Sequence, residues 1–229
     1  MKHIVLFDID GTLLRAQGAG EIAFKRAFED VFNTTSSWNR LALHGRTDPD
    51  IIDEICETIN GRAQTQTEDA RLKERFIFHF EQIIFTHEPF TLMPGIEALL
   101  KSLQAQEDVL LGIETGNLQS TAQMKLIRGS IHSYFQSGGY SSDARDRKDI
   151  VRIAIERMKA LLPSPKDVTV TVIGDSINDI LAADANSARS IGVATGGICS
   201  KTYHHHCTPT LFAEDLSETE KITAFIVGG

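Results

Sequence analysis

Four short β-favouring runs constrain the fold of this chain more than any other feature. Each run is followed at once by small or polar residues that favour a turn, and the runs cover residues 4–9, 109–113, 168–173 and 191–194. Continuous runs of this kind are typical of strands that are buried on both faces. Helical patterns separate the last three runs, so the chain is expected to build βαβ units around a parallel sheet.

One long segment interrupts this alternation. Between residues 15 and 89 the sequence shows helical patterns and no comparable β-favouring run. Within it, Asp48 before Pro49 indicates a helix start, because Asp is a good N-cap and Pro fits the first helical turn. We therefore predict an α/β fold: a Rossmann-like parallel sheet with helices on both faces, plus an inserted all-helical cap. The predicted core domain comprises residues 1–14 and 90–229, and the cap residues 15–89.

Composition and charge narrow the range of partners. The 229 residues carry a formal net charge of −8, with no Lys/Arg run longer than two, which argues against a nucleic-acid-binding surface. No window approaches 18 uncharged apolar residues, so no membrane span is expected. The short, acidic N-terminal run does not resemble a signal peptide, and three cysteines without a CxxC pair are typical of a reducing compartment. A cytoplasmic protein is predicted, and its oligomeric state is left open.

Polar residues follow several of the predicted strands. Asp8 and Asp10 end the first strand, Thr115 follows the second, and Asp175 and Asp179 follow the third. Because the carboxyl ends of parallel strands meet at one crevice, these side chains are expected to lie close together. Carboxylates gathered in this way would repel one another unless a divalent cation held them, and an oxygen-only ligand set suits Mg²⁺. The sequence therefore predicts a magnesium site at this edge of the sheet.

The two aspartates of the first turn, Asp8 and Asp10, suit two different catalytic roles. One carboxylate can attack phosphorus, while the other protonates the leaving group and then activates water. Gly11 and Thr12 fit a tight loop whose N–H groups and hydroxyl can hold phosphoryl oxygens. Thr115, Gly116 and Asn117 precede a predicted helix, and the amides at a helix N-terminus form a second candidate anion site.

These segments resemble the motifs of the haloacid dehalogenase superfamily. The stretch from Asp8 to Leu13 resembles its first motif, Thr115-Gly116-Asn117 the second, and the stretch from Gly174 to Asp179 the fourth. The resemblance therefore extends from residue 8 to residue 179. The helical insert after the first motif is similar to the cap of phosphoglycolate-phosphatase-like members.

The resemblance implies particular roles for four aspartates. It makes Asp8 the nucleophile and Asp10 the general acid and base, with the Asp10 backbone carbonyl also binding Mg²⁺. It makes Asp175 a Mg²⁺ ligand and Asp179 either a ligand or a support for one. The predicted metal site thus comprises Asp8, Asp10, Asp175 and Asp179.

The third motif departs from the family pattern. Family members often carry a lysine followed by Pro-x-Pro, whereas residues 142–150 contain no proline. Arg145, Arg147 and Lys148 are the candidates for the cation that steadies the nucleophile and the phosphate. An arginine would bind phosphate as a planar fork, and a lysine would act as a point charge. We favour Lys148 slightly, with Arg147 close behind.

Three further features lie outside these motifs. Arg46, in the cap loop from His44 to Asp48, is a candidate for binding a substrate anion from above, although the loop fits a simple surface turn equally well. The run from His204 to Cys207 is better explained as a polar loop than as a metal site, because adjacent side chains cannot all face one ion. Glu114 adds negative charge beside an anion site, and the sequence suggests no role for it.

The predicted function is Mg²⁺-dependent hydrolysis of a small phosphorylated metabolite through an aspartyl-phosphate. Asp10 favours phosphate over carbon–halogen chemistry, because a halide leaves without being protonated. Two alternatives remain. One is a sugar phosphomutase, similar to β-phosphoglucomutase, which returns the phosphoryl group to a sugar. The other is a catalytically inactive scaffold that senses phosphate, although both Asp8 and Asp10 are present.

Overall fold

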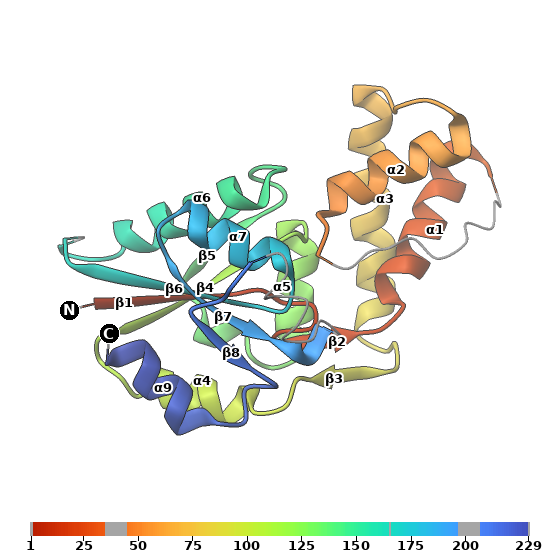
Figure 1. Ribbon diagram of the computed structural model, residues 1–229. Helices are drawn as coiled ribbons and strands as arrows, with labels where there is room; N and C mark the ends of the chain where they lie inside the picture. The colour runs from red at the N-terminus through yellow and green to blue at the C-terminus, as the bar shows by residue number, and fades with distance from the viewer. Residues whose placement is uncertain (1, 35–44, 165, 197–206, 229) are drawn as a thin grey trace.

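A six-stranded parallel sheet forms the centre of the larger part of the molecule in the computed structural model, which describes residues 2–34, 45–164, 166–196 and 207–228 (Figure 1). The strand order is β5-β4-β1-β6-β7-β8, and every neighbouring pair is parallel. The strands are β1 (Lys2–Phe7), β4 (Val109–Thr115), β5 (Ser137–Tyr140), β6 (Val168–Gly174), β7 (Arg189–Val193) and β8 (Leu211–Ala213). The predicted parallel α/β sheet is confirmed, and four of its strands coincide with the β-favouring runs.

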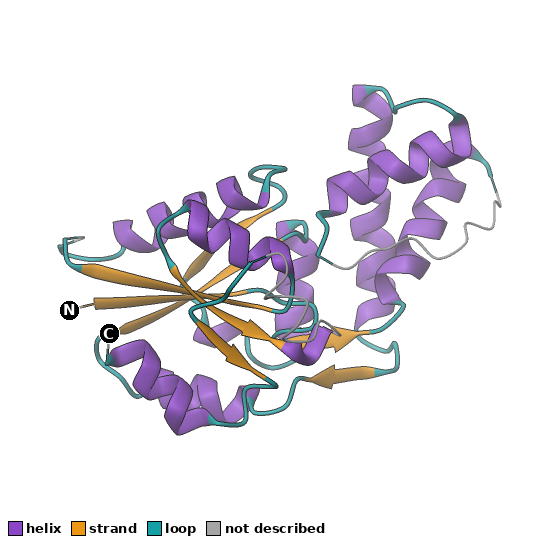
Figure 2. Cartoon of the chain, in the orientation of Figure 1, coloured by secondary structure: helices purple, strands orange, loops and turns teal. Residues whose placement is uncertain are grey.

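Helices cover both faces of this sheet, as Figure 2 shows. They are α4 (Ile96–Gln104), α5 (Gln119–Arg128), α6 (Arg147–Ala160), α7 (Ile177–Ala185) and α9 (Thr219–Val227), with short 3₁₀ turns at His132–Tyr134 and Ala194–Gly196. Along β1, Ile4 and Leu6 pack into an apolar cluster with α6 and α7, while Val5 and Phe7 pack on the opposite face with α4, α5 and α9. This alternation is what a strand buried on both faces requires.

The inserted segment forms a cap with its own apolar core. It contains α1 (Ala19–Phe32), α2 (Asp48–Asn60) and α3 (Gln66–Ile84), and it stands beside the carboxyl edge of the sheet (Figure 1). The rings of Phe24 and Phe76 stack with centroids 3.7 Å apart and join α1 to α3. The N-cap of α2 is Thr47, whose hydroxyl accepts a hydrogen bond from the Asp50 amide, so the sequence placed this helix start one residue late.

A two-stranded antiparallel ribbon connects the cap to the core. Its strands are β2 (Leu14–Ala16), where the chain leaves the core, and β3 (Phe90–Leu92), where the chain returns. Of the boundaries predicted from the sequence, the one after residue 14 lies within β2 and the one after residue 89 lies directly before β3. It lies next to the end of β1 that carries Asp8 and Asp10, so the cap is attached close to the predicted site.

Candidate active site

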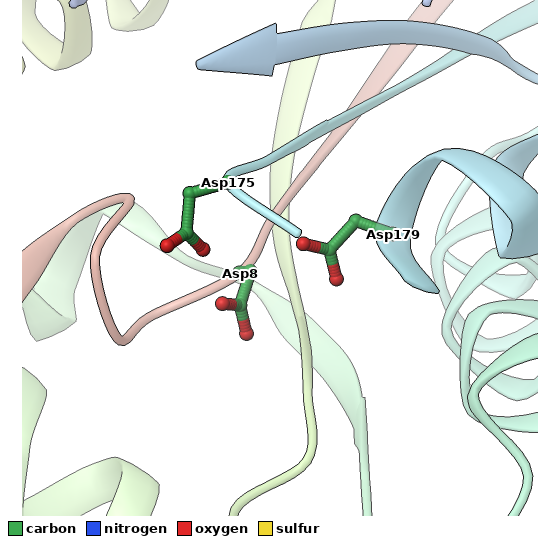
Figure 3. A group of neighbouring side chains, drawn as sticks. All are labelled: Asp8, Asp175 and Asp179. Atoms are coloured by element: carbon green, nitrogen blue, oxygen red, sulfur yellow. The ribbon is translucent and has the colours of Figure 1, made fainter. Parts of the chain in front are cut away.

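Three buried aspartates meet at the carboxyl edge of the sheet. Asp8 follows β1 and Asp175 follows β6, and these two strands are paired side by side in register. Asp179 reaches the same place from the first turn of α7 (Figure 3). Each residue contributes one carboxylate oxygen, and these oxygens all lie within 4.8 Å of one another.

The protonation of this cluster reflects its burial. Burial raises the pKa of Asp8 to about 7, although the nearby Arg147 opposes the shift. Burial and the charges of Asp8 and Asp179 raise the pKa of Asp175 to about 9. A divalent cation would offset this repulsion, and a donor set made only of carboxylate oxygens suits a hard cation such as Mg²⁺. These residues therefore fit a metal of that class.

The carboxylate of Asp10 is not part of this cluster and has its own hydrogen-bond partners. Its Oδ2 accepts hydrogen bonds from Asn117 Nδ2 at 2.9 Å and from Lys125 Nζ at 2.5 Å, and 45% of the side chain is exposed. The chain turns at Gly11, directly after Asp10. Gly11 has a φ of +90°, and a Cβ there would lie 2.2 Å from Asp175 Oδ2, so only glycine fits.

Arg147 provides the positive charge beside Asp8. Its Nη2 lies 2.7 Å from Asp8 Oδ1 and 2.5 Å from Asp179 Oδ1. Its Nε donates to Glu114 Oε2 at 2.8 Å. Only 9% of the Arg147 side chain is exposed, so the guanidinium is enclosed by carboxylates. Burial raises the pKa of Glu114 well above its usual range, while Arg147 opposes this shift.

The other two candidates for the third-motif cation lie elsewhere. Lys148 is 58% exposed and pairs with Asp146 at 2.9 Å on the outer surface of α6. Arg145 pairs with Asp53 of the cap. The slight preference for Lys148 must therefore be corrected, because successive helical residues point about 100° apart and only Arg147 faces the sheet edge.

Only some of the proposed phosphate-binding residues line the cavity that lies between the core and the cap. Thr115, Gly116 and Asn117 line it. The backbone N–H of Asn117 donates to Thr115 Oγ1 at 3.3 Å. Thr12 does not line it: its side chain is fully buried and its hydroxyl donates to Asp175 Oδ1 at 3.3 Å. In this structure, Thr12 orients an acidic residue of the cluster.

A cavity of about 420 Å³ lies above these residues, between the core and the cap. Asp8, Asp10 and Arg147 line it from the core, and Phe24, Phe76 and Phe80 line it from the cap. Arg46 also lines the cavity, but its guanidinium contacts Glu54 and donates to the backbone oxygen of Asp50. The side chain predicted to bind a substrate anion is thus held by two residues of α2, the helix that follows it.

The loop before α2 docks the cap on the core. The Asp48 amide donates to the Gly116 carbonyl at 2.8 Å, and the Asp48 carboxylate accepts from the Leu118 amide at 2.8 Å. Burial raises the pKa of Asp48 to about 6. Asn178 Nδ2 adds a hydrogen bond to the Gly45 carbonyl at 2.7 Å. The cap loop therefore contacts both the second-motif turn and the start of α7.

Two contributors to the site were missed from the sequence: Glu114 as the partner of Arg147, and Lys125 as a partner of Asp10. A signal for Glu114 was present, since a glutamate in a buried strand requires a cation.

Of the His204–Cys207 run, the histidines lie outside the described residues and Cys207 is half-buried. In the part of the chain that the structure describes, no helix has the length and apolar character needed to cross a bilayer.

The chain belongs to the haloacid dehalogenase-like hydrolase family, whose sequence model matches residues 5–193. The chain is 23% identical over 218 residues to the pyrophosphatase PpaX of Oceanobacillus iheyensis, with 93% of each chain covered. Its fold is similar to that of a hydrolase from Pseudomonas syringae, with a TM-score of 0.70, 21% identity and 99% of each chain covered. A predicted phosphoglycolate phosphatase from Haemophilus somnus has a TM-score of 0.68 at 20% identity, with 97% of this chain and 98% of that chain covered.

Proposed function

We propose that this protein is a Mg²⁺-dependent phosphatase that hydrolyses a small phosphorylated metabolite through a phosphorylated Asp8. One observation carries the proposal: Asp8 lies in the buried acidic cluster beside Arg147, whereas Asp10 faces the cavity on a separate set of hydrogen bonds. Two neighbouring carboxylates in such different surroundings suit the two different tasks of a nucleophile and a general acid–base group.

In the first transfer, an Asp8 carboxylate oxygen forms a bond to phosphorus while the bond from phosphorus to the leaving oxygen breaks. Protonated Asp10 gives its proton to that leaving oxygen. In the second transfer, the Asp10 carboxylate takes a proton from water as the water oxygen attacks phosphorus. The bond between Asp8 and phosphorus then breaks, which releases inorganic phosphate and restores both aspartates.

The remaining groups hold charge in place during both transfers. Arg147 presents its guanidinium beside Asp8, where it can bind an oxygen of the phosphoryl group. Asp8, Asp175, Asp179 and the Asp10 backbone carbonyl would hold Mg²⁺, which when bound would neutralise charge developing on the phosphoryl oxygens. Gly116 also lines the cavity, and its backbone N–H would donate to the same oxygens.

The test is phosphate release from p-nitrophenyl phosphate by the purified protein, with Mg²⁺ and with EDTA. Activity should require Mg²⁺ and fall at least ~1,000-fold in Asp8→Asn, because the nucleophile is lost. Acid quenching should trap a phosphorylated protein in the wild type only.

Asp108→Asn is the matched control, since Asp108 pairs with Lys2 at the opposite end of the sheet. Its activity should equal that of the wild type. Full activity in Asp8→Asn would rule out the covalent route. Trapped phosphoprotein that passes its phosphoryl group to a sugar without phosphate release would identify a phosphomutase instead.

A further inference from the structure

Lys125 is a buried lysine on α5 that lies outside the motifs considered above. Only 11% of its side chain is exposed. Its Nζ donates to Asp10 Oδ2 at 2.5 Å and to Asn117 Oδ1 at 2.6 Å. Asn117 Nδ2 donates to the same Asp10 oxygen at 2.9 Å. The three side chains therefore form a closed ring of hydrogen bonds.

This ring restrains Asp10 in one orientation. Both donors act on Oδ2, and the described residues offer no hydrogen bond to Oδ1. The amide of Asn117 is itself fixed, because its oxygen accepts from Lys125 while its nitrogen donates to Asp10. Since Asp10 also lines the cavity, Oδ1 is the oxygen left for a bound molecule.

The surroundings of Lys125 are largely apolar, so burying its ammonium group costs free energy. The neighbouring α5 residues Ala122 and Leu126 belong to an apolar cluster, and the ring of Phe80 from the cap lies 5.7 Å from Nζ. Asp48 of the cap contributes a second nearby carboxylate. Burying an ammonium group costs free energy that the hydrogen bonds must offset, whereas an apolar side chain would fill this position without that cost.

We propose that Lys125 is the positioning residue of Asp10, holding one carboxylate oxygen so that the other faces the leaving group. This inference rests on the proposed phosphatase function. Lys125 keeps its own protons throughout. The proton given to the leaving oxygen comes from Asp10, and the proton taken from water returns to Asp10. Enclosure between α5 and the cap strengthens these hydrogen bonds, because water is kept from competing for them.

The test exploits the difference between good and poor leaving groups. Kcat/KM is measured with Mg²⁺ for p-nitrophenyl phosphate, whose leaving group is a weak base, and for phenyl phosphate, whose leaving group is as basic as a tyrosine side chain. For each ester, kcat/KM reports the steps up to phosphorylation of Asp8. Only the second ester depends strongly on a proton from Asp10.

Lys125→Met should lower kcat/KM about 100-fold for phenyl phosphate and no more than about 10-fold for p-nitrophenyl phosphate, because a misplaced acid costs most where protonation is needed. The loss should appear in kcat and leave KM nearly unchanged. Lys125→Arg keeps the charge and the donors, so it should recover most of the phenyl phosphate activity.

Several outcomes would overturn the proposal. An equal loss on both esters would mean a purely structural role, and a rise in KM alone would mean that Lys125 binds substrate. If Lys125→Met failed to fold, the same comparison with Lys125→Arg and Lys125→Gln would decide. Lys221→Met, on the exposed surface of α9, is the control for removal of a lysine and should match the wild type. A wild type inactive on both esters would instead contradict the proposed function.

Discussion

Glu114 accepts a hydrogen bond from Arg147 Nε at 2.8 Å, and its side chain has no exposure to solvent. The glutamate comes from the end of β4, and the arginine is the first residue of α6. The Nη2 of the same guanidinium forms ion pairs with Asp8 and Asp179. Because Glu114 fixes one edge of the planar guanidinium, the other edge has a fixed direction toward Asp8.

Two substitutions of Glu114 should distinguish how much its charge and its hydrogen bond to Arg147 each contribute to the free energy of unfolding. Glu114→Leu leaves Arg147 Nε buried without this acceptor, so the free energy of unfolding should fall by about 3–5 kcal/mol. Glu114→Gln keeps an acceptor of similar shape and should lose less than half as much. Urea denaturation at constant Mg²⁺ measures both. Equal losses in the two variants would show that the charge of Glu114, and not the hydrogen bond, matters.

Arg147 and Lys148 give a direct test of the third-motif cation. Arg147→Met should reduce kcat/KM at least ~100-fold, because the only cation seen beside Asp8 among the described residues is removed. Arg147→Lys should recover only part, since a lysine lacks the fork that spans three carboxylates. Lys148→Met should stay within about twofold of the wild type, because such an exposed ion pair contributes little. A large loss in Lys148→Met would restore the assignment made from the sequence.

The acidic cluster predicts how metal binding depends on pH. The pKa values of Asp8, about 7, and Asp175, about 9, are raised, so the folded metal-free protein holds more protons than the unfolded chain. Its free energy of unfolding should therefore fall as the pH rises from about 4 toward 9. Mg²⁺ binds the ionised carboxylates, so it should raise the Tm more at about pH 8 than at about pH 5.

Thermal melts with Mg²⁺ or EDTA at several pH values measure this effect. Asp175→Asn is the matched variant and should show both a smaller pH dependence and a smaller Mg²⁺ shift. A Mg²⁺ shift that is the same at every pH would show that these carboxylates do not hold the metal.

Gly116 tests the contact between the cap loop and the core. A Cβ at this position would lie 2.4 Å from the backbone oxygen of Arg46, so Gly116→Ala should push the cap loop away. Kcat/KM should fall roughly 100-fold, because small displacements of positioning groups are costly. The Mg²⁺-dependent rise in Tm should persist, since the acidic cluster does not involve this loop. Wild-type kinetics in Gly116→Ala would mean that this close contact has no part in turnover.

The sequence predicted the parts of the site that depend on strand order. Asp8 and Asp175 follow β-favouring runs, and adjacent parallel strands bring such residues together whatever their separation along the chain. Strand β5 was missed because Ser137-Gly138-Gly139-Tyr140 lacks a β-favouring pattern, and pairing with β4 decides its conformation.

Residues whose direction depends on helix phase were harder to predict. Arg147 and Lys148 are neighbours in the first turn of α6, and a shift of one residue in the helix start exchanges their directions. Lys125 looks like an ordinary polar residue of an amphipathic helix, and its role appears only when α5, the first-motif turn and the cap are assembled. The direction of the Thr12 hydroxyl likewise depends on the distant Asp175.

The ribbon of β2 and β3 determines how the cap can move. Both chain crossings between core and cap run through it, and they are hydrogen-bonded to each other through the pairs Leu14–Leu92, Arg15–Thr91 and Ala16–Phe90. A single connecting strand would permit swivelling about its own bonds, but a paired ribbon resists twisting and bends mainly across its width. The cap is therefore attached to the core by one hydrogen-bonded ribbon and not by two independent linkers, and this pairing ties the two chain crossings to a single place beside Asp8.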